Sequence, residues 1–208
     1  MIAMKRKIIV IASIAAVIVA SSALLAFTDK GGKEDAAKKA VMESSMIKAQ
    51  SFYDELPDKL ETAAVYNAKD VSRDTLFSLK SLDGIPDAGS QWYVDVDRSV
   101  EMTLTEKDGK FKVIGSSLPP QEGDQYVVTR MDPKDTNALL EKYSSDNGYD
   151  TVVVSIPQFL DTRLLLISSS DGMKAALVNG REDFCGMKLG EVIDFGDALS
   201  RLENGFPD

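Results

Sequence analysis

The longest uncharged apolar stretch of the chain runs from Ile8 to Phe27 and directly follows the basic residues Lys5, Arg6 and Lys7. A helix of this length reaches about 30 Å, the thickness of the hydrocarbon core of a bilayer. Because basic flanks stay on the cytoplasmic side of a membrane, the rest of the chain is expected on the other side. The pattern predicts a cytoplasmic tail (residues 1–7), a transmembrane anchor (8–27), a linker (28–33) and an extracytoplasmic domain (34–208).

A cleaved signal peptide is the alternative interpretation of the same stretch. Residues 8–19 would form its apolar region, and the small residues from Ala20 to Ala23 would form its cleavage site. Leu24 to Phe27 carry the apolar run beyond these small residues, which favours an anchor. A lipid anchor is excluded, because the only cysteine is Cys185. We therefore predict a single-pass protein of the cell membrane, or a secreted domain if the segment is cleaved.

Apolar residues with helical spacing come after the glycine pair Gly31-Gly32. They alternate spacings of four and three, which places them on one face of a helix: Met42, Met46, Ala49, Tyr53, Leu56, Leu60 and Ala63. We predict a juxtamembrane amphipathic helix from Lys33 to about Leu56, with a kink or a new helix at Pro57. Its apolar face, from Met42 to Leu56, either contacts another subunit near the membrane or packs on its own domain.

A period of two begins at Gln91. Trp92, Val94 and Val96 alternate with other residues, and the pair Asp108-Gly109 separates this run from the next apolar one. This pattern is typical of a β-hairpin whose turn needs positive φ angles. Further strands are predicted at residues 126–128, 151–156, 163–167 and 173–178. Short helices are predicted at residues 70–82, 134–143 and 189–202, the second of them after the N-cap Asp132 and Pro133.

Together these elements predict an α+β fold. The transmembrane helix and the juxtamembrane amphipathic helix lead into a mainly antiparallel β-sheet with two or three packed helices. Residues 115–124 contain two glycines and two prolines and have no periodicity, so they mark a boundary between two subdomains, 34–116 and 125–208. No segment repeats at a fixed period.

Composition narrows the function mainly by exclusion. The tail holds three of the 24 basic residues, which leaves 21 against 33 acidic residues and a charge of −12 on the exported part. Nucleic acids and anionic lipids are bound by basic side chains, so neither is an expected partner. The chain contains no histidine. Serine-histidine and cysteine-histidine catalysis, and zinc sites built on histidine, are therefore excluded.

One set of short motifs resembles a serine-lysine acylating enzyme. Residues 45–48 (SMIK) fit S-x-x-K, residues 145–147 spell S-D-N, and residues 188–190 (KLG) resemble K-T-G. Penicillin-binding proteins and class A β-lactamases use these motifs in this order. The match covers few positions, and leucine replaces the threonine of the third motif. We interpret it as a chance match and predict no catalytic residues, and an enzyme of the serine-lysine kind is the third hypothesis for this chain.

Two pairs of acidic residues are candidate calcium ligands, because Ca²⁺ prefers oxygen donors. Asp95 and Asp97 are expected on one face of a strand, and Asp146 and Asp150 flank a glycine turn. Neither pair belongs to the calcium-loop pattern of EF-hands. The sequence therefore assigns no metal or cofactor site.

These observations favour a non-enzymatic, membrane-anchored subunit of a secretion, pilus or surface assembly, which acts through contacts with envelope proteins or with itself. The alternative is an exported domain that binds a small molecule or Ca²⁺ near Trp92, Asp95 and Asp97, or at the turn 182–186. The order of anchor, helix and sheet resembles type IV pilin-like subunits in architecture alone. The apolar run has no glutamate near its start and Gly31-Gly32 is expected to interrupt the helix, so no family is assigned.

Overall fold

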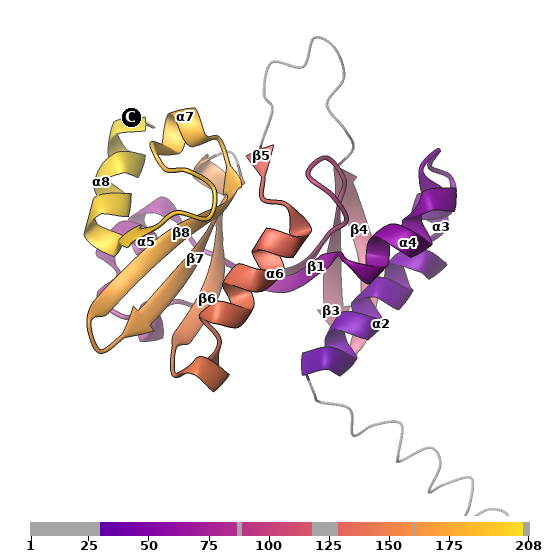
Figure 1. Ribbon diagram of the computed structural model, residues 1–208, viewed down its shortest axis with the longest axis horizontal. Helices are drawn as coiled ribbons and strands as arrows, with labels where there is room; N and C mark the ends of the chain where they lie inside the picture. Colours follow the sequence, from indigo (N-terminus) through magenta and orange to yellow (C-terminus); the bar gives the residue numbers. More distant parts are fainter. Residues whose placement is uncertain (1–29, 87–88, 118–128, 160, 206–208) are drawn as a thin grey trace, which may run out of the picture. The chain divides into compact units, whose positions relative to one another are not determined.

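A computed structural model of the protein describes residues 30–86, 89–117, 129–159 and 161–205 (Figure 1). Residues 37–208 form one compact unit. The predicted tail and anchor, with Lys5, Arg6, Lys7, Ile8 and Phe27, lie outside the described residues, as does the predicted strand at 126–128. No helix within the described ranges is long and apolar enough to cross a membrane.

The described residues contain a single nine-stranded, mostly antiparallel sheet. Its strand order is β4-β3-β2-β1-β6-β7-β8-β5, and β9 also pairs with β8. The strands are β1 (Ala64–Asp70), β2 (Ser90–Asp95), β3 (Glu101–Lys107), β4 (Lys110–Ser117), β5 (Thr129–Arg130), β6 (Asp150–Ile156), β7 (Thr162–Ser169), β8 (Gly172–Gly180) and β9 (Val192–Asp194). The predicted α+β class with a mainly antiparallel sheet is confirmed.

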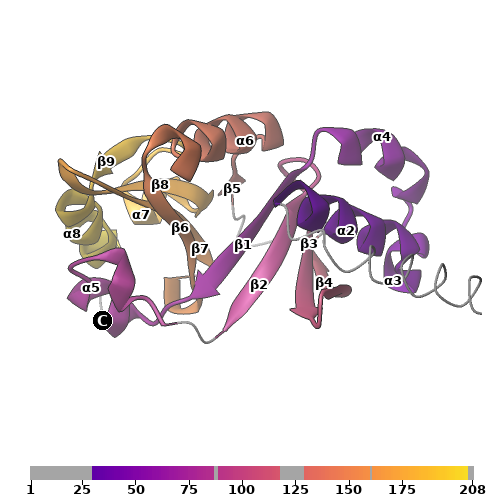
Figure 2. The ribbon, with the colours of Figure 1, turned by 90° about the horizontal axis from the view of Figure 1, so that it is seen from below.

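One parallel strand pair lies in the middle of this sheet. Strands β1 and β6 run parallel with Ala68 beside Val153, whereas the other described pairs are antiparallel. We call β4-β3-β2-β1 the first half-sheet, and β6-β7-β8 with β5 and β9 the second half-sheet. Figure 2 shows β1 and β6 where the two half-sheets join.

Two α-helices, α2 (Lys30–Glu43) and α3 (Ser45–Lys48), take the place of the single predicted amphipathic helix. The new helix predicted at Pro57 is α4 (Leu56–Glu61). The backbone of Ser44 is extended (φ −67°, ψ 124°), so α2 cannot continue into α3. Serine competes for backbone hydrogen bonds and favours helix ends over helix interiors. Pro57 lies in the first turn of α4, where its fixed φ angle suits a helix start.

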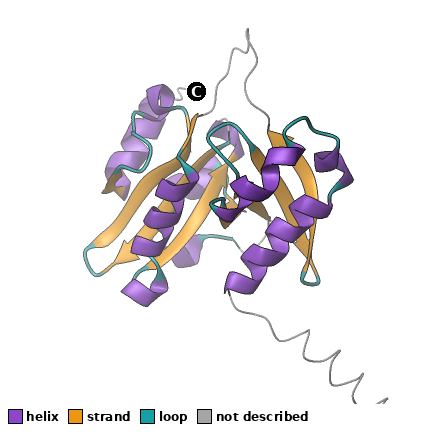
Figure 3. Ribbon diagram, turned by 45° about the vertical axis from the view of Figure 1, so that its right-hand side comes forward, coloured by secondary structure: helices purple, strands orange, loops and turns teal. Residues whose placement is uncertain are grey.

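These helices cover one face of the first half-sheet. The core between them contains apolar residues from helices and strands alike: Val41, Ile47, Leu56, Leu60, Val65, Val94, Met102 and Leu104. Figure 3 shows the helical layer against the strands. Because β1 alternates its side chains between two faces, Val65 enters this core while Ala64 and Tyr66 enter another.

The second half-sheet carries helices on both faces. Helix α6 (Pro133–Lys142) covers one face, where Leu139 packs on Val153 and Leu165. Helices α5 (Arg73–Ser78), α7 (Glu182–Cys185) and α8 (Phe195–Gly205) cover the other face, above Val154 and Leu164. Because these strands are buried on both faces, their sequences are continuous apolar runs and do not alternate between apolar and polar residues.

Several local predictions are confirmed. Asp108 (φ 52°) and Gly109 (φ 72°) form the predicted turn between β3 and β4. The carboxylate of Asp132 caps α6 by accepting the backbone N–H of Lys134 at 3.1 Å. The strands predicted at 151–156, 163–167 and 173–178 are β6, β7 and β8.

Two segments differ from prediction. The segment predicted as a helix at 189–202 contains strand β9, which pairs Ile193 with Ala175 of β8, before α8 begins at Phe195. Strand β1 was not predicted, because the apolar helical face ends at Ala63 and no element was assigned to residues 64–69. Its burial pattern explains the difference, because four of its first five residues are buried and the two-residue period is hidden.

Candidate functional site

The predicted interaction residues do not share one surface. Leu56 is fully buried, and Met42 and Tyr53 pack against the core of the first half-sheet. The Tyr53 hydroxyl also donates to the backbone oxygen of Met42 at 3.3 Å. Met46 is 43% exposed and Ala49 is exposed. The break at Ser44 therefore divides the predicted stripe into an inward part and an outward part.

The predicted acidic sites are also separated. The Asp97 carboxylate accepts the N–H groups of Ser99 and Val100 at 2.8 and 2.9 Å, so it stabilises a turn. Trp92 donates its indole N–H to Glu106 at 3.0 Å. Asp95 is buried in a different environment, described below.

The remaining sequence motifs lie on separate elements. Residues 45–48 form α3, residues 145–147 form the 3-10 turn η3 after α6, and residues 188–190 follow α7. Figures 1 and 2 both place α3 and α7 at opposite ends of the sheet. In the turn at 182–186, Glu182 accepts the N–H of Leu189 at 2.7 Å. No group of three or more acidic, cysteine or histidine side chains within the described residues is arranged to hold a metal ion.

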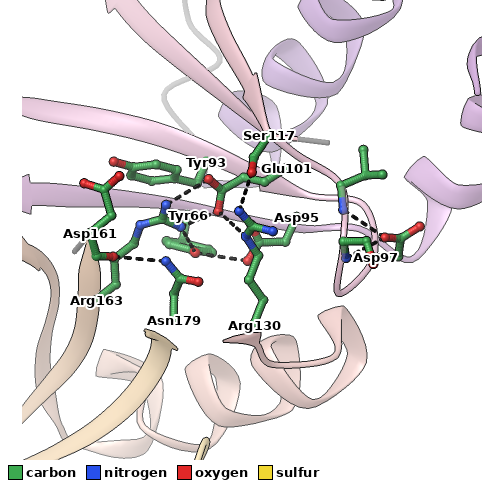
Figure 4. Close-up of polar contacts among 12 residues, drawn as sticks. Tyr66, Tyr93, Asp95, Asp97, Glu101, Ser117, Arg130, Asp161, Arg163 and Asn179 are labelled. Carbon is green, nitrogen blue, oxygen red and sulfur yellow. Dashed lines mark hydrogen bonds and ion pairs between the residues drawn. The ribbon is translucent and has the colours of Figure 1, made fainter. Parts of the chain in front are cut away.

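A different group of polar side chains is buried inside the molecule. We call it the arginine cluster; each member is at most 7% exposed, and its members are Tyr66, Tyr93, Asp95, Glu101, Arg130 and Arg163. Charged residues are seldom buried to this extent unless they are paired. Figure 4 shows how their side chains converge.

Strand register brings these residues together. Tyr66 of β1 lies opposite Tyr93 of β2, and Asp95 of β2 lies opposite Glu101 of β3. Residues two apart on a strand share a face, so Tyr93 and Asp95 point to the same side. The two arginines come from the second half-sheet, Arg163 from β7 and Arg130 from β5.

Glu101 receives hydrogen bonds from both arginines. Arg163 donates Nη2–H to Oε1 at 2.8 Å and Nη1–H to Oε2, which is a bidentate pair. Arg130 donates Nε–H to Oε2 at 3.2 Å, and its Nη2–H donates to Ser117 Oγ at 2.8 Å. Bidentate contacts between guanidinium and carboxylate groups are strong and fix the geometry of both partners.

The two tyrosines line the same arginine. Arg163 donates Nη1–H to the Tyr66 hydroxyl at 2.9 Å, and that hydroxyl donates to Asp95 Oδ2 at 3.0 Å. The guanidinium carbon of Arg163 lies 3.5 Å from the ring centroid of Tyr93, a cation–π contact. Burial raises the pKa of Tyr66 well above its ordinary value. Tyr66 therefore keeps its proton and can act as the donor to Asp95.

The two carboxyl groups have opposite pKa shifts. Burial opposes ionisation of Glu101, but the charge and hydrogen bonds of Arg163, aided by Arg130, lower its pKa to about 2. Burial, followed by the charge of Glu101, raises the pKa of Asp95 well above its ordinary value. The cluster therefore favours an ionised Glu101 beside a neutral Asp95.

Three buried atoms of the described side chains have no hydrogen-bond partner: Asp95 Oδ1, Arg163 Nε and Asn179 Oδ1. Asn179 lies opposite Arg163 in the pairing of β7 and β8, and its Nδ2–H donates to the Asp161 backbone oxygen at 3.0 Å. Buried unpaired polar atoms are uncommon in folded proteins, so each of the three requires a physical explanation.

Sequence reasoning had singled out only Asp95 from this cluster. One sequence signal was available for Arg163, which lies within the buried, otherwise apolar β7 sequence TRLLLI. A charge inside such a run indicates a buried ion pair, because an unpaired one would be too costly. Glu101 and Arg130 offered no comparable signal.

The architecture and the cluster together define an α+β domain held by an internal network of arginines, carboxyl groups and tyrosines. The chain matches no protein-family model, and searches among curated proteins and solved structures find no match.

Proposed function

We propose that this protein is a non-enzymatic, single-pass membrane protein whose extracytoplasmic domain acts through contacts with other envelope proteins. Membership of a secretion, pilus or surface assembly follows from the predicted topology. Exposed Met46 is the observation that carries the contact proposal, since Met42 and Leu56 of the same sequence stripe turn inward. The proposed contact surface is therefore the outward part of the stripe, Met46 and Ala49 around α3.

The charges of the arginine cluster support a structural role for its polar groups. Arg130 and Arg163 both direct hydrogen bonds to Glu101, so their charges are matched inside the domain. A site that binds a charged ligand would keep such donors available for that ligand. This use of the two arginines argues against a site for an anionic ligand within the cluster.

Chain length limits where the domain can act. The connection from Phe27, the end of the predicted anchor, to Lys30, the start of α2, is three residues long and spans at most about 11 Å. A domain held by so short a connection can reach only partners in or close to the same membrane.

Site-specific photo-crosslinking in cells that express the full chain tests this proposal. A photoreactive residue at position 49 should crosslink to a second copy or an envelope protein, and Met46→Asp should abolish the product. The matched control is a photoreactive residue at Glu203, an exposed position on α8. Equal products from positions 49 and 203, or products unaffected by Met46→Asp, would contradict the contact surface.

Fractionation with intact-mass measurement tests the anchor in the same cells. Membrane-bound protein of full mass supports the anchored topology. Recovery of a soluble, monomeric protein shortened by about 23 residues, as cleavage after Ala23 would give, would refute it. In that case thermal stabilisation by Ca²⁺ would test the ligand-binding alternative.

A further inference from the structure

The arginine cluster lies where the two ends of the strand order meet. Strand β5 is the last in the order, and β4 and β3 are the first two. Nevertheless, Arg130 of β5 donates to Ser117 of β4 and to Glu101 of β3. The sheet is therefore curled until its first and last strands are within reach of one side chain (Figure 4).

Within the cluster, Asp95 and Glu101 are directly opposed on β2 and β3, and both are buried. Two ionised carboxylates in this buried position would repel each other strongly. The ionised form would also leave Asp95 Oδ1 without a hydrogen-bond donor. A single proton on Oδ1 removes both difficulties, because the resulting hydroxyl donates to Glu101 while Oδ2 still accepts from Tyr66.

Groups from four strands face Asp95: Tyr66 (β1), Glu101 (β3), Arg130 (β5) and Arg163 (β7). Both arginines would attract a negative charge on Asp95. Their hydrogen bonds, however, go to Glu101, Ser117 and Tyr66, whereas Asp95 accepts its hydrogen bond from a neutral tyrosine. Glu101 therefore takes the negative charge, and Asp95 holds the proton.

We propose that Asp95 and Glu101 share one proton, and that this proton makes the arginine cluster a pH-dependent latch that holds the curled sheet closed. While the cluster holds β5 against β3 and β4, Asp95 keeps its proton. When the cluster opens and water reaches Asp95, the proton is released. Opening should therefore increase as pH rises above about 4, the ordinary value for aspartate, and level off at the raised pKa of Asp95. On the acid side, opening should increase as Glu101 takes up a proton toward pH 2.

Infrared spectroscopy of the full-length protein in detergent tests the shared proton directly. At neutral pH the spectrum should contain the carbonyl stretch of a buried, protonated carboxyl group. Asp95→Asn should remove that band, since asparagine can replace the donated hydrogen bond but has no acid proton. Asp108→Asn is the matched control, because Asp108 is exposed and an Asn-Gly pair keeps the turn. Absence of the band from the wild-type protein, or its persistence in Asp95→Asn, would overturn the proposal.

Hydrogen exchange tests the latch. The Met131 amide, which donates to the Val178 backbone oxygen beside β5, reports opening, and the Leu165 amide inside β7 serves as the internal reference. At each pH, the Met131 exchange rate of the wild type is divided by that of Asp95→Asn, so that the intrinsic pH dependence of exchange cancels. Above about pH 4 this ratio should rise by up to about tenfold per pH unit. The ratio for Asp108→Asn should stay constant. A constant ratio for Asp95→Asn as well would refute the latch, even if the proton is present.

Discussion

Glu101 joins β3 to two strands of the second half-sheet, because its two oxygens receive guanidinium groups from β5 and β7. A buried ion pair is not by itself strongly stabilising, since desolvation offsets most of the attraction. Removing one partner of the pair is strongly destabilising, because the remaining charges stay buried without compensation. At the scale of the residue, the cluster therefore has little tolerance for loss of a single charge.

We expect Glu101→Gln to lower the free energy of unfolding by about 3–5 kcal/mol, the usual effect of breaking a buried ion pair. Arg130 and Arg163 would remain buried with only a neutral amide between them. Urea unfolding followed by circular dichroism measures the change. Glu203→Gln removes an exposed charge on α8 and should change stability by about 0.5 kcal/mol or less. Equal effects of the two substitutions would contradict the role given to Glu101.

The residue scale is also where sequence reasoning was weakest. Asp95 was identified as a candidate because it alternates with apolar residues, but that pattern made it a partner of Asp97. The structure pairs it with Glu101 and Tyr66 instead. Such partners depend on strand register and on the curl of the sheet, which local spacing does not encode.

At the scale of the element, two glycines with open space around them allow the effect of backbone conformation on stability to be measured apart from the effect of side-chain packing. A methyl group added at Gly109 or at Gly196 would meet no atom within 4 Å. Gly109 has a φ of 72° in the β3–β4 turn, whereas Gly196 lies in the first turn of α8. The two sites differ in backbone conformation rather than in available space.

We expect Gly109→Ala to destabilise the protein by about 1–2 kcal/mol, because a β-carbon is unfavourable in the left-handed region. Gly196→Ala should stabilise it by about 0.5–1 kcal/mol, since alanine loses less entropy in a helix. Thermal unfolding of both variants and the wild type measures whether each substitution raises or lowers the stability of the protein. Destabilisation of similar size at both positions would show that backbone conformation does not decide these effects.

Element prediction succeeded where one local signal was sufficient. The Asp108-Gly109 turn and the capped start of α6 at Asp132 and Pro133 are both encoded within a few residues. It failed at β1, where four of the first five residues are buried and the sequence shows no two-residue alternation. It also failed at Ser44, where α2 ends although the apolar spacing continues. In both places tertiary packing, rather than periodicity, determines the structure.

At the scale of the whole molecule, the arginine cluster should shape the dependence of stability on pH. Glu101 has a lowered pKa of about 2, so its contribution is complete above about pH 4.5 and is lost as pH falls toward 2. Asp95 has a raised pKa, so its contribution is complete below about pH 4 and is lost as pH rises. The pair therefore contributes most to stability in mildly acidic solution.

We expect the unfolding free energy of Asp95→Asn to fall less than that of the wild type as pH rises from about 4 to 7. Denaturant titrations at several pH values, on the full-length protein, measure both curves. Asp108→Asn again provides the control for loss of one carboxyl group. Parallel curves for wild type and Asp95→Asn would mean that Asp95 does not hold a proton in the folded protein.

The fold class was predictable at this scale, since helical and strand periods occupy separate stretches of the chain. The strand order was not. Pairing of β1 with β6 requires a choice between several strands that look alike in sequence, and β1 itself carried no strand signal.

That parallel pair also imposes an order of events on folding. Strands β1 to β4, and strands β6 to β8, pair mainly with their neighbours in sequence, so each group can form through short loops. Ala68 meets Val153 only after a long intervening segment has been ordered, and contacts between distant residues form slowly because loop closure costs entropy. A chain that emerges from its N-terminus would thus expose the unpaired edge of β1 until β6 arrives, which makes this edge the place where a folding helper would bind or aggregation would begin.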